Sequence, residues 1–281
     1  MRRGACALCL LLAASLPPLH GQHSVYVDDT LRAFSGEGQL AAAMARARRN
    51  DELSSVVDGE LDLGPHDELQ DEIITNPSNL AFDAEGALFV ASFTLDHVVR
   101  FRFIPRSADH PTRRARYRIF ARDLDGPSAL AVDPGGGLFV ASFGGDEVLR
   151  FGADGQRLQR YGNEEEVDCP EGLALGGDGL LYVSSWHRGW VVRYNTTSGA
   201  FLGRFLQPAA AAADSATTAF PEELAFTPDG HLLVSHFYSN TLMLYTGPTD
   251  QGGGGESLGP LLRGKVLRGP VGMVVGPDEF L

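Results

Sequence analysis

The sequence has 281 residues, of which 43% are hydrophobic, and a formal net charge of -13 at pH 7. A chain of this length and apolar content buries a sizeable core, which argues against disorder and suits one large all-β domain or two smaller domains. The negative charge argues against nucleic acid as a partner, because binding to phosphates requires a basic face.

The N-terminal segment has the pattern of an export signal. Two arginines precede the apolar run ACALCLLLAASL, which is too short to cross a bilayer as a helix. We therefore expect residues 1–21 to be a cleaved signal peptide and the mature protein to be secreted or otherwise extracytoplasmic, with no transmembrane segment. Cys6 and Cys9 leave with the signal, so Cys169 remains alone and no internal disulfide forms.

Residues 22–76 precede the regular part of the sequence. They open with HSVYVDDTLRAFSGEG, whose residues are compatible with two outer strands of a sheet, and continue through the helix-prone run AAAMARARR. They end in an acidic stretch up to Asn76, which we expect to be a linker.

From Pro77 onward the sequence repeats. Four segments share a Pro-x-x-Leu start, a turn rich in Asp, Gly or Pro, and an apolar run: PSNLAFDAEGALFVASF, PSALAVDPGGGLFVASF, PEGLALGGDGLLYVSSW and PEELAFTPDGHLLVSHF. The repeats occupy residues 77–126, 127–169, 170–220 and 221–269, and a partial copy, PVGMVVGPDEFL, occupies 270–281. Spacings of 43 to 51 residues between the prolines are typical of propellers and solenoids.

Each repeat predicts four strands. The run after the proline and the LFVASF run form a hairpin, a third strand follows at VVRF or its equivalents, and a more polar fourth strand ends the repeat. In the last full repeat we expect this fourth strand at LLRGKVL, residues 261–267. Apolar content that fades outward over four antiparallel strands is typical of a propeller blade. The sequence therefore predicts an all-β fold, a β-propeller of four-stranded antiparallel blades.

The partial fifth copy leaves two alternatives. Either strands from the N-terminal segment complete this blade and close a five-bladed propeller, or the sequence is a fragment of a six-bladed one. We prefer the second interpretation, because a chain that ends inside a buried strand leaves sheet edges that propellers normally protect.

The repeats resemble NHL-type repeats of exported proteins. The resemblance rests on PSALAVDPGGGLFVASFGGDEVLRF and on PEGLALGGDGLLYVSSWHRGWVVRYNTTSGAFLGRF, in which Pro-x-x-Leu-Ala opens the blade and Gly-Ala-Phe begins the outer strand. It covers about residues 77–281. The six-bladed superfamily of these proteins also holds gluconolactonase-like hydrolases and streptogramin lyase-like proteins, so the resemblance implies a fold and leaves the function open.

Four polar residues at the start of the inner strands form the predicted binding site. Glu171 and Glu222 follow the repeat proline by one position, and Asn79 and Glu223 follow it by two. Equivalent positions of neighbouring blades point toward one central channel. The bland alternative is that these residues only line a wet channel.

The resemblance to gluconolactonase-like proteins implies a divalent cation held at this mouth by a Glu, an Asn and an Asp. Asn79 resembles the Asn, whereas the expected Asp-Ser at the end of the second strand is Ala-Ser or Ser-Ser here. From the oxygen donors we predict a weakly bound calcium ion with Glu171 and Glu222 as principal ligands and Asn79 or Glu223 as helpers. No other cofactor is expected.

His187 and His236 stand near the ends of second strands and are candidates for a metal ligand or a general base, or are ordinary strand-end residues. Cys169 has no base close to it in the sequence, which favours a buried structural role. An arginine recurs on the third strand, and we expect it to pair with a carboxylate of a neighbouring blade: Arg100, Arg150 and Arg193.

A rigid disc with few catalytic signatures predicts a binding or recognition scaffold, acting as a monomer on a protein or small-molecule ligand. The alternative is a metal-dependent lactonase-like hydrolase or a lyase at the channel mouth. The hydrolase would need at least three convergent ligands. The lyase would need a His facing a Glu, with His187 or His236 opposite Glu222 as its candidates. No residue is assigned a catalytic role.

Overall fold

The computed structural model describes residues 58–62, 73–104, 114–207, 220–249, 253–264, 267 and 269–273. The predicted signal peptide, most of the 22–76 segment and most of the partial fifth copy lie outside the described residues. Within the described part, the chain is built from strands, and it contains no helix with the length and apolarity needed to cross a membrane.

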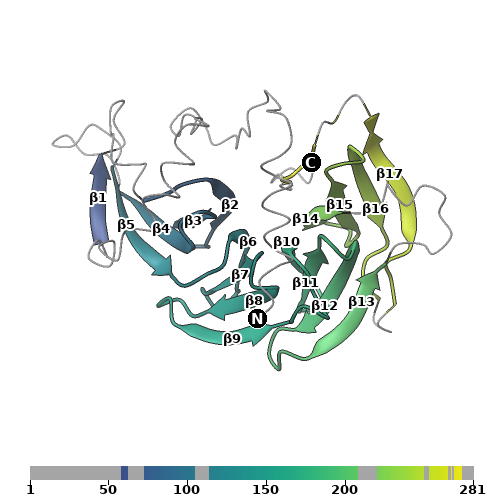
Figure 1. The fold of residues 1–281 in the computed structure, drawn as a ribbon, viewed down its shortest axis with the longest axis horizontal. Helices are drawn as coiled ribbons and strands as arrows, with labels where there is room; N and C mark the ends of the chain where they lie inside the picture. Colours follow the sequence, from purple (N-terminus) through teal and green to yellow (C-terminus); the bar gives the residue numbers. More distant parts are fainter. Residues whose placement is uncertain are drawn as a thin grey trace.

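The strands form four antiparallel sheets (Figure 1). The first sheet has the order β1-β5-β4-β3-β2, with β1 Asp58–Asp62, β2 Pro77–Phe82, β3 Leu88–Ser92, β4 His97–Ile104 and β5 Arg114–Ala121. The second holds β6 Pro127–Val132, β7 Leu138–Ser142, β8 Glu147–Phe151 and β9 Arg157–Tyr161. The third holds β10 Pro170–Leu175, β11 Leu180–Ser185, β12 Trp190–Asn195 and β13 Phe201–Leu206. The fourth holds β14 Pro221–Phe226, β15 Leu232–His236, β16 Thr241–Tyr245 and β17 Ser257–Arg263.

The strand that begins at each repeat proline is the innermost of its sheet. β2 packs beside β6, β6 beside β10, and β10 beside β14. Figure 1 shows the sheets fanned around this shared centre, with β9, β13 and β17 on the outside. The chain is therefore an all-β propeller, and the prediction that the Pro-x-x-Leu strand is innermost is confirmed.

The hydrophobic core lies between neighbouring blades. Both copies of LFVAS, β3 and β7, are buried at all five positions. One apolar cluster joins Phe89 of the first blade to Leu138 of the second, and another joins Phe139 of the second to Val183 of the third. The second strand thus contacts a blade on either face, so repeated geometry requires repeated residues.

The recurring arginine pairs within its own blade. Arg100 Nη2 lies 2.5 Å from Asp83 Oδ2, and Arg150 Nη2 lies 2.5 Å from Asp133 Oδ2. Each aspartate belongs to the first hairpin turn of the same sheet, so the expectation of a neighbouring blade's carboxylate is wrong for these two arginines. The third strand runs beside this turn, which makes the local carboxylate the nearer partner. Each guanidinium also stacks on a phenylalanine of the second strand, Phe89 or Phe139.

A side chain in the turn after the second strand ties one blade to the next. Asp96 Oδ1 accepts the N–H of Gly126 at 2.9 Å, and Asp146 Oδ1 accepts the N–H of Cys169 at 2.8 Å. Asn240 Oδ1 accepts the N–H of Gly269 at 2.8 Å in the same way. The third blade has Gly189 at this position, which has no side chain to offer.

The outer strands differ from the sequence expectations. β17 spans Ser257–Arg263, four residues earlier than the predicted strand at 261–267. Most of its residues are exposed, so no alternation of apolar residues marks its ends. β1 falls in the acidic stretch that was expected to be a linker, and it pairs with β5 in a register that sets acidic residues opposite arginines.

Val140 tests the assignment of the second strand. It is fully buried between blades, so Val140→Asp places an unpaired charge in the core and should destabilise the fold by at least about 4 kcal/mol. Glu164→Ala is the control, because this side chain is exposed and its loss should change the free energy of unfolding by no more than about 0.5 kcal/mol. Equal melting temperatures for the two variants would contradict the assignment.

Candidate functional site

Each residue that precedes a repeat proline lies in the left-handed region of backbone space. The φ angles are 53° for Asn76, 63° for Gly126, 52° for Cys169, 63° for Phe220 and 55° for Gly269. Glycine adopts this conformation at little cost and asparagine tolerates it, whereas cysteine and phenylalanine are strained there. The strain is therefore concentrated where β10 and β14 begin, and strain of this kind is often found at functional sites.

In the first three blades a serine at the end of the second strand holds the chain just before this left-handed residue, whereas the fourth blade has His236 at that strand position. The hydroxyls of Ser92, Ser142 and Ser185 each accept a backbone N–H and donate to the carbonyl of the same residue, two positions before the proline: Thr75, Asp125 and Asp168. These serines of the LFVAS-type runs are therefore structural. In the third blade the serine also positions Asp168.

The two residues after each proline leave the regular pairing with the second strand. The register shifts between Pro170 and Leu173 and between Pro221 and Leu224, and the same shift occurs in the first two blades. Bulges of this kind re-aim side chains near functional sites. The four predicted site residues all occupy these two positions.

The structure brings Asn79 of the first blade against Glu223 of the fourth. Asn79 Nδ2 donates to Glu223 Oε2 at 2.9 Å, across the centre of the fan. Trp186 Nε1 donates to Glu222 Oε1 at 2.9 Å. Glu171 lies near enough to Glu222 and Glu223 for their charges to act on it. We call these four residues, Asn79, Glu171, Glu222 and Glu223, the channel cluster.

A serine of the third blade fixes the backbone under the channel cluster. Ser184 Oγ accepts the N–H of Gly172 and donates to the carbonyl of Glu222, both at 2.7 Å. A Cβ on Gly172 would lie 2.2 Å from that carbonyl oxygen, so only glycine fits at this close approach. Sequence reasoning did not single out Ser184. In the sequence, Ser184 stands where the first two blades have the alanine of LFVAS. The fourth blade also has a serine there, Ser235, which accepts the N–H of Glu223 at 3.1 Å.

The earlier blades use the same positions differently. Ser78 and Ser128 donate to the carbonyls of the next repeat prolines, Pro127 and Pro170, at 2.5 and 2.6 Å. The serines therefore join inner strands to one another, and the carboxylates come from the third and fourth blades only.

Burial raises the proton affinity of all three carboxyl groups. Burial is the main cause of the raised pKa of Glu171, and the charges of Glu222 and Glu223 add to it. Burial also raises the pKa of Glu222, against the indole N–H of Trp186, which favours the carboxylate. The pKa of Glu223 rises to about 8 by burial, although bonds from Leu224 N–H and Asn79 oppose the rise. The three carboxyl groups of the channel cluster therefore favour a proton or another positive charge beside them.

Aromatic side chains form an arc that meets the channel cluster where Trp186 bonds to Glu222. Ring centroids lie 6.0 Å apart for Phe93 and Phe143, 6.4 Å for Phe143 and Trp186, and 4.7 Å for Trp186 and Phe220. Tyr238 continues the arc at 5.2 Å from Phe220 and is 48% exposed. We call these five residues the aromatic rim. Three of the five, Phe93, Phe143 and Trp186, are the aromatic residues that end the second-strand runs of the first three repeats.

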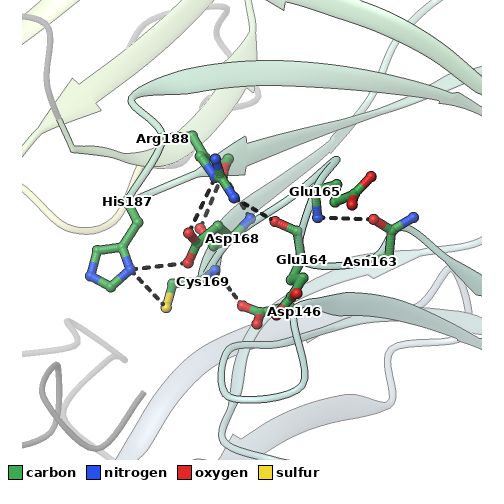
Figure 2. A network of polar contacts seen from close by, with 9 residues as sticks. Asp146, Asn163, Glu164, Glu165, Asp168, Cys169, His187 and Arg188 are labelled. Atoms are coloured by element: carbon green, nitrogen blue, oxygen red, sulfur yellow. Dashed lines mark hydrogen bonds and ion pairs between the residues drawn. The ribbon is translucent and has the colours of Figure 1, made fainter. Parts of the chain in front are cut away.

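Beside the rim, Asp168, Cys169 and His187 converge (Figure 2). His187 Nδ1 lies 3.0 Å from Asp168 Oδ1 and 3.5 Å from Cys169 Sγ. Among the described residues this is the only group of three His, Cys, Asp or Glu side chains whose ligand atoms all lie within 4.8 Å of one another. The sequence does not reveal it, because 18 residues separate the thiol from its imidazole neighbour.

The channel carboxylates are not gathered as tightly. Within the described structure they do not form a group with ligand atoms inside 4.8 Å, so a shared cation would require their side chains to move. His236 lies elsewhere: it is 2% exposed and lines a cavity of about 240 Å³ between the third and fourth blades, with neighbours that include Trp190, Leu206 and Tyr245.

No protein-family model and no curated protein matches the chain. Among solved structures, virginiamycin B lyase from Staphylococcus aureus is similar, with a TM-score of 0.52, 16% identity, and coverage of 79% of this chain and 65% of the lyase. A streptogramin B lyase gives a TM-score of 0.52 at 14% identity, over 72% of this chain and 60% of the other. A gluconolactonase-like protein gives 0.47 at 18% identity, over 66% and 63%.

The likenesses to the two lyases agree with the propeller class that the sheets define. At such identities they concern the fold alone. The described fold corresponds to about two thirds of the lyases' length, since 65% of the first and 60% of the second are covered.

The raised pKa values predict a pH-dependent stability. A buried carboxyl whose folded pKa lies above its ordinary value near 4.5 binds more protons in the folded state, so the free energy of unfolding falls as pH rises from about 4.5 to about 8. Glu223→Gln should flatten this dependence, because glutamine does not titrate. Thermal melts from pH 5 to pH 9 check it. Parallel curves for the variant and the parent would show that Glu223 does not carry the effect.

Proposed function

We propose that the protein is an exported ligand-binding propeller whose site is the channel mouth and whose ligand carries positive charge. The observation that supports this most directly is the convergence of Glu171, Glu222 and Glu223 with Asn79. Three carboxyl groups close together repel one another when ionised, and a bound cation removes that cost. Their raised proton affinity expresses the same preference for positive charge.

The donor chemistry supports a hard cation as the simplest ligand. Carboxylate and amide oxygens are the ligands that calcium prefers, and no thiol or imidazole belongs to the channel cluster. Glu171 and Glu222 would be the principal ligands, with Asn79 or Glu223 as helpers. The ion would supply charge neutralisation there and would displace protons from the carboxyl groups.

The aromatic rim supports a site that also takes organic ligands. Its rings are partly exposed, and Trp186 joins the rim to the channel cluster through its bond to Glu222. Aromatic faces attract organic cations, and concave sites usually combine apolar walls with a few polar groups. A monomeric binding scaffold that presents this mouth to solvent fits these features.

Calorimetric titration with calcium tests the proposed site. The parent protein should give a weak binding isotherm at pH 8, and the double variant Glu171→Gln, Glu222→Gln should give none. Glu164→Gln is the matched control, since it removes one exposed carboxylate that is not part of the channel cluster. Absence of binding in the parent, or equal binding in the double variant, would show that the channel carboxyl groups do not form a cation site.

A second function is favoured by one observation. The pKa of Glu223 near 8 keeps this carboxyl protonated at neutral pH, which suits a general acid. With the fold shared by streptogramin B lyase, this supports a lyase or lactonase-like hydrolase as the alternative.

Incubation with a streptogramin B antibiotic and with simple lactones tests the catalytic alternative. Under the binding proposal neither substrate is consumed. Turnover that is lost in Glu223→Gln, and retained in Glu164→Gln, would establish the enzyme instead. Product analysis by mass spectrometry checks this without any assumption about which bond is cleaved.

A further inference from the structure

We infer that Asp168, Cys169 and His187 form a binding site for a zinc-class metal ion, separate from the channel cluster. The three side chains present one thiol sulfur, one imidazole nitrogen and one carboxylate oxygen toward a common point (Figure 2). This combination of donors is typical of zinc and cobalt sites, whereas calcium and magnesium take oxygen ligands.

The separations match tetrahedral coordination. Zinc binds a thiolate sulfur at about 2.3 Å and an imidazole nitrogen at about 2.0 Å, so two such ligands at a tetrahedral angle lie about 3.5 Å apart. Cys169 Sγ and His187 Nδ1 are 3.5 Å apart. His187 Nδ1 and Asp168 Oδ1 are 3.0 Å apart, and a small outward shift of the carboxylate accommodates an ion.

The contacts around His187 Nδ1 fit a bound cation. This nitrogen carries either a proton or a lone pair. A protonated Nδ1 donates to Asp168, with the sulfur of Cys169 as a second, weaker acceptor, and an unprotonated Nδ1 accepts from the thiol of Cys169. A metal ion is bound by nitrogen, oxygen and sulfur together. As the metal–sulfur bond forms, the thiol proton is released to solvent.

Neighbouring groups hold the ligands in place. Arg188 Nε lies 3.2 Å from Asp168 Oδ2, which leaves the other carboxylate oxygen facing His187. Asp146 Oδ1 accepts the N–H of Cys169, which fixes the cysteine in its left-handed conformation. Such second contacts orient the ligands of metal sites. The left-handed conformation is common to the residues before the repeat prolines, and at Cys169 it places the thiol beside the imidazole.

The site is accessible from one side. The Cys169 residue is 1% exposed, whereas the side chains of His187 and Asp168 are 28% and 27% exposed. An ion therefore enters from the side of the imidazole. Three protein ligands leave a fourth tetrahedral position for water, as in zinc sites that remain open to a ligand. The site adjoins the aromatic rim, since the rings of His187 and Trp186 are 5.0 Å apart.

Cobalt substitution tests the inference. Every protein in the experiment carries Cys6→Ser and Cys9→Ser, so that Cys169 is the only thiol. Under reducing conditions at pH 7.5, the full chain should bind one Co²⁺ and show the charge-transfer absorption of a cobalt–thiolate bond. Zinc should displace the cobalt, and excess calcium should not.

Two variants identify the ligands. Cys169→Ser and His187→Ala should each abolish the thiolate absorption and weaken zinc binding by more than about 10-fold. His187 is at the surface, so His187→Ala should keep the melting temperature of the metal-free parent, and it decides the question even where Cys169→Ser fails to fold.

Two controls separate this site from others. His231→Ala removes an imidazole whose Nδ1 lies 2.9 Å from Asp229 Oδ2, the same kind of pair without a thiol, and should leave cobalt binding unchanged. Glu171→Gln with Glu222→Gln should also leave it unchanged, which makes the inference independent of the channel proposal. Absence of a thiolate band, or a band that persists in His187→Ala, would overturn it.

Discussion

The start of each inner strand is the constraint on which the rest of the molecule depends. In the first three blades a serine hydroxyl at the end of the second strand holds the backbone two residues before the proline, and in all four blades the residue just before the proline turns through the left-handed region. The chain then enters the inner strand with two residues outside the regular ladder. The same local geometry builds the blade and sets the direction of the side chains that line the channel.

The functional features arise where the third and fourth repeats depart from the first two. Serines that link inner strands in the early blades become Glu171 and Glu222, and the left-handed position is occupied by Cys169 and Phe220. The carboxyl groups favour positive charge because burial and mutual repulsion penalise their ionised forms. The thiol and imidazole next to them favour a softer ion. Two different donor chemistries therefore lie on either side of Trp186, which bonds to Glu222 and contacts the ring of His187.

The fold followed from the sequence because its signal is repeated. A period near 50 residues and repeated continuous apolar runs between turns identify blades, and β3 and β7 are buried as the LFVAS pattern indicates. The convergence of Asn79 with Glu223 also followed, since equivalent positions in a propeller face one axis. The link between Cys169 and His187 did not, because it depends on a turn and a left-handed residue that no residue pattern marks. The bounds of the outer strand β17 were predicted four residues too late, because an exposed strand has no apolar pattern that marks its ends.

The glycine in the third blade's turn has a further consequence. In the other blades a side chain in the turn after the second strand ties the blade to the next: Asp96, Asp146 and Asn240. The third blade has Gly189 there, and Ser184 joins it to the fourth blade beside the channel. A consensus sequence averaged over the repeats would restore aspartate or asparagine at this position and make the junctions alike. Such an idealised propeller would keep its blades and lose an asymmetry, in which the residue that joins the third blade to the fourth, Glu222, is also the one that contributes a carboxyl group to the channel cluster.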